Sequence, residues 1–189
     1  RDDRVLKAAA SLAALTVTAC LAGTSARAAT VELAAGSADG LAAALAAAGS
    51  GGTIIVKTGE RALYFVLGGG RAIRYGVAVG KEGFSWSGIA RVGRKVVNPS
   101  WTPPEEMIER KPELAEWADG MPGGIAENPL GVRAMYLYKG QRDTLFRIHG
   151  TNAPSSIGTA ASSGCIRMLN REVIELYSRT RIGTKVIVI

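Results

Sequence analysis

The stretch His149–Met168, "HGTNAPSSIGTAASSGCIRM", contains the only histidine of the 189-residue chain and one of its two cysteines. The preceding run "TLFRIH" is typical of a β-strand that ends at His149, and Gly150 then opens a loop of small residues. Gly164 stands directly before Cys165, where a glycine permits a sharp turn or a close approach of the backbone to a ligand. We therefore expect the loop to leave the sheet at His149 and return at Cys165, which would bring both side chains into one groove.

An imidazole and a thiol in one groove indicate a specific chemistry. A thiol with a pKa of about 8.5 is mostly protonated at neutral pH, and a neighbouring imidazole can remove its proton. A backbone carbonyl often fixes the tautomer of such an imidazole, and N–H groups at a Gly–Cys turn can form an oxyanion hole. The residues thus predict acyl transfer through Cys165. The alternative is a cysteine that fills the core and a histidine with a structural role.

The sequence around this stretch predicts a mainly β domain. Short β-branched and aromatic runs alternate with glycine-rich turn signals, which is typical of six or seven short strands. The runs are "TIIVKT", "RALYFVL", "RAIRYGVAVG", "GIARVGRKVV", "VRAMYLY", "TLFRIH" and "GTKVIVI".

One helix is indicated, directly after the cysteine. Asn170 is expected to N-cap "REVIELYSR", with Glu172 in the first turn near the positive end of the helix dipole. Val173, Leu176 and Tyr177 follow helical spacing and are expected to form its buried face.

A long interruption runs from Asn98 to Gly131 and is rich in proline and acidic residues. It also carries Trp101 and Trp117, so it is interpreted either as a packed flap or as a structural excursion over a core edge. Its seven acidic and two basic side chains contrast with the basic remainder of the domain. We expect the flap to cover the Cys165 groove and to attract an amine acceptor.

The N-terminal part resembles targeting and linker sequence. Residues 1–28 are typical of a secretory signal, with a cleavage site at Ala26-Arg27-Ala28. The alternative is a lipobox in "VTAC", which would lipidate Cys20. Residues 29–52 are interpreted as a low-complexity linker with a weak Ala-rich helix at 41–48, followed by the domain at 53–189.

The net charge and the number of cysteines limit the classes of binding partner and cofactor that the chain could have. The formal net charge is +7, and removal of residues 1–28, with four basic and two acidic side chains, would leave +5. This charge suits an anionic polymer or surface. The sequence has no basic stripe with interleaved aromatic residues, so nucleic-acid binding is not expected. In an exported chain Cys165 would have no disulfide partner, which indicates a reactive thiol or an intermolecular pair. No ligand spacing typical of zinc is present, so neither a metal nor a cofactor is expected.

The block "HGTNAPSSIG...SSGCIRMLNREVIELY" resembles the L,D-transpeptidase (YkuD-type) catalytic domain, and the resemblance extends over 53–189. It implies a β-sandwich-like fold with one short helix after the catalytic cysteine and a long flap insertion. It also implies a cysteine-dependent acyltransferase in the periplasm or cell envelope of a bacterium, with roles in cell-wall biogenesis and cell shape.

The resemblance also implies roles for individual residues. Cys165 would be the nucleophile, His149 the general base and acid, and the carbonyl of Gly150 would orient His149. The amides of Gly164 and Cys165 would form the oxyanion hole. Many members have a histidine immediately before the Gly–Cys pair, whereas Ser163 fills that place here, so His149 would carry the base role alone. The expected substrate-binding residues are Arg167, Ser162, Ser163 and Asn152.

The implied reaction begins when Cys165 attacks the carbonyl of residue 3 of a peptidoglycan tetrapeptide stem and D-Ala leaves. An amine of another stem (a 3→3 cross-link), a lipoprotein lysine or a free D-amino acid would then take the acyl group. The alternatives are an L,D-carboxypeptidase or another cysteine acyl hydrolase of the cell wall, and a non-catalytic wall-binding module. Contact with a membrane is expected only through the signal or a lipid anchor.

Overall fold

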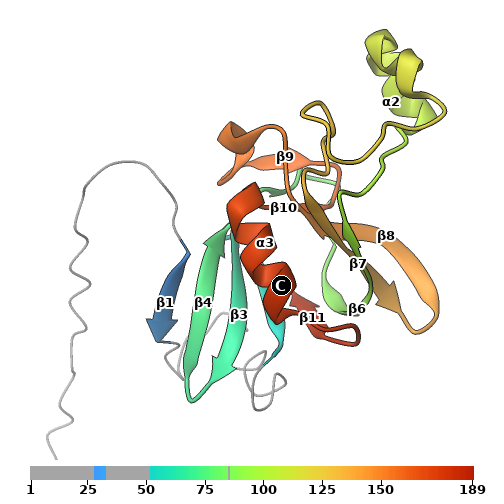
Figure 1. The fold of residues 1–189 in the computed structure, drawn as a ribbon. Helices are drawn as coiled ribbons and strands as arrows, with labels where there is room; N and C mark the ends of the chain where they lie inside the picture. The colour runs from blue at the N-terminus through green and yellow to red at the C-terminus, as the bar shows by residue number, and fades with distance from the viewer. Residues whose placement is uncertain (1–27, 33–51, 85) are drawn as a thin grey trace, which may run out of the picture.

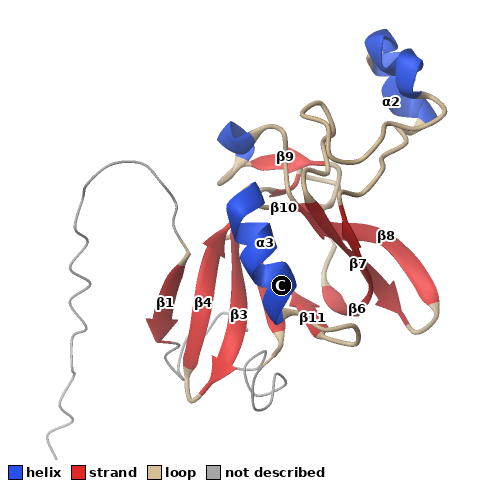
Figure 2. Cartoon of the chain, viewed as in Figure 1, coloured by secondary structure: helices blue, strands red, loops and turns tan. Residues whose placement is uncertain are grey.

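The computed structural model describes residues 28–32, 52–84 and 86–189. Their strands are β1 (Ala29–Glu32), β2 (Ile54–Lys57), β3 (Ala62–Gly68), β4 (Arg71–Gly76), β5 (Val79–Gly80), β6 (Gly88–Val97), β7 (Arg133–Lys139), β8 (Arg142–His149), β9 (Ala160–Ser162), β10 (Ile166–Arg167) and β11 (Lys185–Val188). The helices are α2 (Glu105–Arg110) and α3 (Asn170–Arg179), with 3-10 turns η1 (Pro112–Trp117) and η2 (Pro154–Ser156). The prediction of a mainly β domain with a helix after Cys165 is confirmed (Figure 2).

Nine of these strands form one sheet in the order β1-β4-β3-β2-β11-β6-β7-β8-β10, and β5 pairs with β9 in a separate parallel pair. Figure 1 shows β1, β4 and β3 as one group of strands and β6, β7 and β8 as another. The strand β11 joins the two groups, because it pairs parallel with β2 and antiparallel with β6. Strands β8 and β10 lie at the far edge, where β10 runs parallel to β8.

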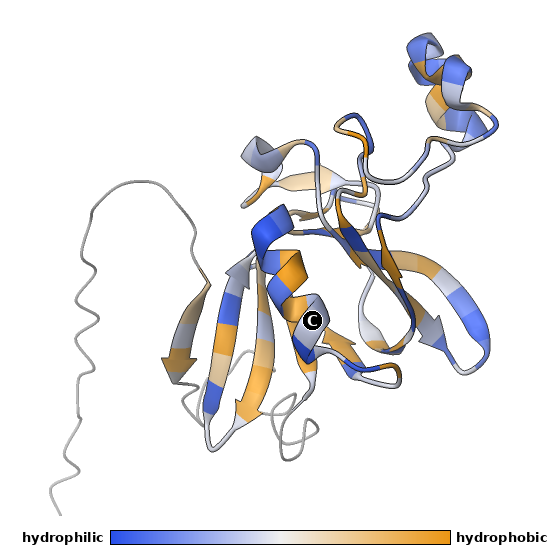
Figure 3. Cartoon of the chain, viewed as in Figure 1, coloured by the Kyte–Doolittle hydropathy of each residue, from blue (hydrophilic) through white to orange (hydrophobic). Residues whose placement is uncertain are grey.

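The larger of two core clusters lies between the sheet and α3, and the smaller includes Ile55, Tyr64 and Ile187 of β2, β3 and β11. Val173 and Leu176 of α3 are fully buried and pack with strand residues that include Ile54, Leu137 and Ile148. Figure 3 shows the hydrophobic residues concentrated along β3, β11 and part of α3. Burial of each such aliphatic side chain stabilises the fold by roughly 1.5–3 kcal/mol, so α3 is fixed against the sheet and fixes the loop before it.

Two expectations about local structure differ from the observed elements. Leu169 occupies the N-cap of α3 without a side-chain cap, and Asn170 is the first helical residue. The carboxamide of Asn170 bonds to the His149 loop instead, so it is not available for capping. In addition, the first residues of the expected linker form β1, which pairs with β4 from Ala29↔Arg74 to Glu32↔Arg71. Residues 1–27 of the expected signal at 1–28, including Cys20 of the alternative lipobox, and the expected helix at 41–48 lie outside the described residues.

The long segment Asn98–Gly131 has an anchored base and an exposed tip. A bridge joins Trp101 to Met121, and the buried Asn128 side chain donates hydrogen bonds to the carbonyls of Pro99 and Pro122. The tip consists of α2 and η1, neither of which has a buried residue. Figure 1 shows α2 projecting away from the sheets. Met121 at the base is buried, whereas Trp101 and the larger apolar residues of the tip are only half-buried.

No helix within the described ranges is long and apolar enough to cross a membrane.

Candidate active site

Strands β8 and β10 position the histidine and the cysteine. β8 ends at His149, and β10 begins at Ile166, directly after Cys165. The parallel register pairs His149 with Arg167. Cys165 directly precedes β10, so the register places it beside the end of β8 that carries His149. The loop expected from the sequence does leave and return at neighbouring strands.

His149 is held in one tautomer and is neutral at physiological pH. Its side chain is 4% exposed, and Nδ1 lies 2.6 Å from the carbonyl oxygen of Gly150. Nδ1 must carry the proton to donate this hydrogen bond, so Nε2 is left as the acceptor. Burial lowers the pKa of His149 to about 4, with a further contribution from the charges of Arg167 and Arg147, while the Gly150 carbonyl opposes the shift.

Asn170 holds the loop that carries this carbonyl, a role that the sequence did not reveal. Its Oδ1 accepts the N–H of Thr151 at 3.0 Å, and its Nδ2 donates to the Thr151 carbonyl at 3.0 Å. A Cβ at either Gly150 or Gly131 would overlap Asn170 Oδ1, so both positions require glycine. The backbone of β10 adds a bond from the Met168 N–H to the His149 carbonyl at 2.8 Å.

Cys165 is half-buried, with Sγ 3.9 Å from the carbonyl oxygen of Leu145. Burial raises the pKa of the Cys165 thiol, although the Arg147 backbone and the charges of Arg147 and Arg167 oppose this shift. Among the described residues, no hydrogen bond joins Sγ to the His149 ring. Burial therefore favours a neutral thiol and a neutral imidazole in the resting protein.

Ser162 shapes the turn before the nucleophile. Its hydroxyl donates to the Cys165 carbonyl at 2.5 Å and accepts the Gly164 N–H at 3.1 Å. Gly164 has φ +107°, and a Cβ there would lie 2.5 Å from Phe146 Cε1. Because the Gly164 N–H already has an acceptor, the N–H directed to an oxyanion would first be that of Cys165. Within the described residues, the Cys165 N–H has no hydrogen-bond acceptor.

The other expected substrate-binding residues are Arg167, Ser163 and Asn152, and not all of them lie beside His149 and Cys165. The Arg167 backbone exchanges two hydrogen bonds of 2.9 Å with Ala78, and its charge acts on both His149 and Cys165. Ser163 is exposed at the turn. Asn152 lies apart, because its Nδ2 donates to the Glu127 carbonyl at 2.7 Å and it lines a separate cavity of about 220 Å³ beside Asn170.

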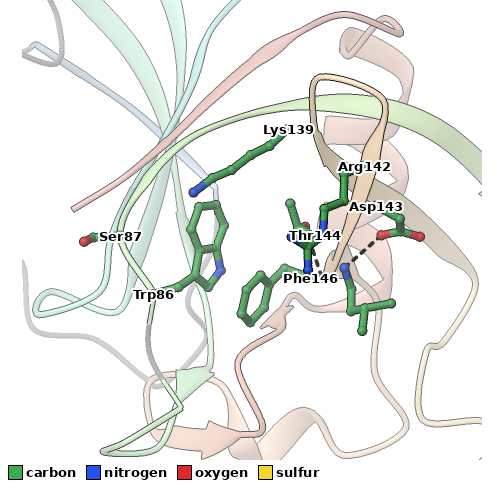
Figure 4. A pocket seen from close by; sticks show the side chains of 8 residues that line it. Trp86, Ser87, Lys139, Arg142, Asp143, Thr144 and Phe146 are labelled. Carbon is green, nitrogen blue, oxygen red and sulfur yellow. Dashed lines mark hydrogen bonds between the residues drawn. The ribbon is translucent and has the colours of Figure 1, made fainter.

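Figure 4 shows a larger cavity, of about 290 Å³, that shares Leu145 with the surroundings of the thiol. Its lining residues are Trp86, Ser87, Lys139, Arg142, Asp143, Thr144, Leu145 and Phe146. One wall is a bulge in β8, where the register moves from Tyr138↔Asp143 to Tyr136↔Arg147 and Leu145 takes φ 63°. The sequence pattern did not reveal this bulge.

Residues 51–188 match the model of the L,D-transpeptidase catalytic domain, and the chain belongs to this family. A curated relative from Escherichia coli strain K12, the probable L,D-transpeptidase YbiS, is 30% identical over 138 residues. The match covers 70% of this chain and 43% of YbiS, so this chain spans less than half the length of that relative.

Solved structures share the fold. A crystal structure from Brucella melitensis, described as a probable carnitine operon oxidoreductase, is 43% identical with a TM-score of 0.53, covering 86% of this chain and 93% of that one. The catalytic domain of the Enterococcus faecium L,D-transpeptidase acylated by ertapenem is 20% identical with a TM-score of 0.53. That match covers 74% of this chain and 98% of the other. The second likeness supports the fold alone.

Proposed function

We propose that this protein is a peptidoglycan L,D-transpeptidase in which Cys165 carries the acyl group. The observation that supports this most is that Cys165 directly precedes β10, the strand paired with the end of β8, where a neutral His149 has its Nδ1 proton committed to Gly150. That arrangement leaves Nε2 free to accept the thiol proton, which is the first requirement of the reaction.

In the proposed first half-reaction, His149 takes the proton of Cys165 and Sγ attacks the carbonyl of stem residue 3. The Cys165 N–H stabilises the tetrahedral oxyanion, and the Gly164 N–H joins it once Ser162 Oγ releases that bond. The C–N bond then breaks, the imidazolium of His149 protonates the leaving amine, and D-Ala departs from the thioester. A pre-formed ion pair is not needed, since proton transfer and attack are coupled.

In the second half-reaction an amine attacks the thioester, His149 takes its proton, and Cys165 leaves as the thiol. The acceptor is an amine of another stem, of a lipoprotein lysine or of a free D-amino acid. Water in place of the amine would make the product a trimmed stem, which is the carboxypeptidase alternative. The site of action that fits this substrate is the periplasm or cell envelope.

The central test uses Cys165→Ala and His149→Ala with purified tetrapeptide stems and mass spectrometry of the products. We expect both variants to lose acyl transfer while circular dichroism shows the parent's fold. Ser178→Ala is the matched control, because its hydroxyl bonds only within α3, to the Glu175 carbonyl. A Cys165→Ala protein that still consumed the stems would overturn the thiol mechanism.

A second test uses a carbapenem, since a strained lactam carbonyl resembles the scissile amide. The E. faecium relative has been solved as an ertapenem-acylated enzyme. Intact-protein mass spectrometry is expected to show one adduct on the parent and none on Cys165→Ala. A parent that stays unmodified while its thiol titrates as reduced would contradict the proposed nucleophile.

A further inference from the structure

The cavity in Figure 4 is lined in part by the segment of β8 that also contacts the catalytic turn. Leu145 and Phe146 line the cavity, and the same two residues contact the catalytic turn. The Leu145 carbonyl lies 3.9 Å from Cys165 Sγ, and Phe146 lies where a Cβ of Gly164 would be. The cavity therefore adjoins the catalytic turn, and Leu145 and Phe146 are shared between the two.

The walls of this cavity are aromatic, and its free polar groups are donors. Trp86 and Phe146 stack with ring centroids 4.9 Å apart, and the Lys139 ammonium lies 5.8 Å from the Trp86 ring centre. Figure 4 shows this ammonium above the indole. Trp86 Nε1 is buried without a hydrogen-bond partner among the described residues. Arg142, which is exposed at the start of β8, adds a second cation.

The only acidic side chain in the lining is already neutralised. The Asp143 carboxylate accepts hydrogen bonds from Arg147 at 2.6 and 3.0 Å and from the Leu145 N–H at 2.8 Å. These contacts hold the β8 bulge and leave Lys139 and Arg142 without a counter-charge in the cavity. A cation such as the free amine of a stem would be repelled there. An anion would be attracted by Lys139 and Arg142 and would accept their hydrogen bonds.

We infer that this cavity binds the C-terminal carboxylate of the acyl donor, which is the carboxylate of the D-amino acid that leaves. The inference rests on the proposed function and adds a specificity site to it. The terminal carboxylate of a donor whose scissile carbonyl is at Cys165 would pair with Lys139 and Arg142 beside the Trp86 ring. A donor extended by one residue would place a neutral amide there instead, and would lose the ionic contact.

The kinetic test compares a tetrapeptide stem with the same stem whose C-terminus is an amide. Lys139→Met and Arg142→Gln are each expected to raise KM for the acid by about five- to tenfold and to leave KM for the amide nearly unchanged. Lys139→Arg should retain most of the acid preference. Arg181→Gln, an exposed cation beyond α3, is the matched control. If the acid-to-amide ratio in Lys139→Met and Arg142→Gln equals that of the parent, the inference is wrong.

A binding test separates this inference from the proposed function, because it requires no turnover. The Trp86 indole N–H resonance is assigned in Cys165→Ala protein as the signal that disappears in Cys165→Ala/Trp86→Phe. N-acetyl-D-alanine is expected to shift this resonance, and N-acetyl-D-alanine amide is not. Equal shifts, or none with either probe, would overturn the carboxylate site. If the parent protein does not turn over stems but the resonance shifts as expected, the proposed function is wrong and the carboxylate site stands.

Discussion

The carboxamide of Asn170 and the backbone of Thr151 form a closed pair of hydrogen bonds, each 3.0 Å long. The pair connects the first turn of α3 to the loop that begins at His149. Since the Gly150 carbonyl in this loop fixes the His149 tautomer, the helix indirectly sets the orientation of the imidazole.

Asn170→Ala is expected to slow acylation of Cys165 by about 10- to 100-fold, because a loop displaced by about 1 Å misplaces the base. The loss of two neutral hydrogen bonds should also lower the free energy of unfolding by about 1–3 kcal/mol. Carbapenem acylation kinetics and urea denaturation measure the two effects. Ser178→Ala in the same helix is the control, and an acylation rate in Asn170→Ala equal to that of Ser178→Ala would contradict the positioning role.

Gly164→Ala is expected to destabilise the protein more than Gly158→Ala. Both glycines have positive φ, at +107° and +86°, so both alanines incur a backbone penalty of about 1–2 kcal/mol. A Cβ at Gly158 meets no atom within 4 Å, whereas one at Gly164 would lie 2.5 Å from Phe146. The extra crowding should add about 1–3 kcal/mol in thermal or chemical denaturation. Equal losses in the two variants would show that the turn has more room than the structure gives it.

Glu172 is expected to make the protein less stable as the pH rises from 4.5 to about 7. The side chain is 3% exposed, and neither carboxylate oxygen has a hydrogen-bond partner among the described residues. Burial raises the pKa of Glu172 from 4.5 to about 7; Arg171 and the Ala28 backbone oppose the shift, and Glu175 adds to it. Between these values the folded state holds a proton that the unfolded state has lost, so stability is greatest below pH 4.5 and falls up to pH 7.

Glu172→Gln removes this dependence because the amide does not titrate. The melting temperature of the variant relative to the parent should increase from pH 5 to pH 8, by the equivalent of about 1–3 kcal/mol. The lowered pKa of His149 acts in the opposite direction, with stability lost as the pH falls from 6.5 to about 4, but it is common to both proteins and cancels. Glu113→Gln, in η1 where no residue is buried, is the control. A pH-independent difference for Glu172→Gln would refute the assignment.

Replacement of α2 and η1 by a short Gly-Ser bridge tests the proposed role of the flap. Neither element has a buried residue, so the free energy of unfolding should change little. If the acidic tip attracts the amine acceptor, the deletion should slow transfer to the amine and leave formation of the Cys165 thioester unchanged. Single-turnover acylation and amine transfer are measured separately, and parental rates for both steps would exclude a role for the tip.

The sequence predicted the strands and the His–Cys pair because both have local signatures. Val- and Ile-rich runs such as that of β2 are buried on both faces and can hardly form anything else. The strands β5 and β10 are two residues long, and only their partners β9 and β8 define them. Two residues are too few to show the alternation of apolar and polar side chains by which a strand is recognised in a sequence.

The supporting residues of the site escaped prediction for a related reason. An asparagine before a helix indicates an N-cap, and the same residue type at Asn170 serves a contact with Thr151 that is distant in sequence. The bulge at Leu145 lies inside a run with strand character. Asp143 and Thr144, which bond to the backbone of the bulge, were the only local signal, since both residue types favour turns.

The central position of β11 has a consequence for the time at which the chain can fold during synthesis. Before Lys185–Val188 leaves the ribosome, β1-β4-β3-β2 and β6-β7-β8-β10 have no strand between them and remain two half-sheets. Each half would expose an unpaired edge, at β2 and at β6, which is a site for aggregation. The two half-sheets can therefore join only after β11 has been synthesised. A premature stop before β11 would release a product prone to edge-to-edge association.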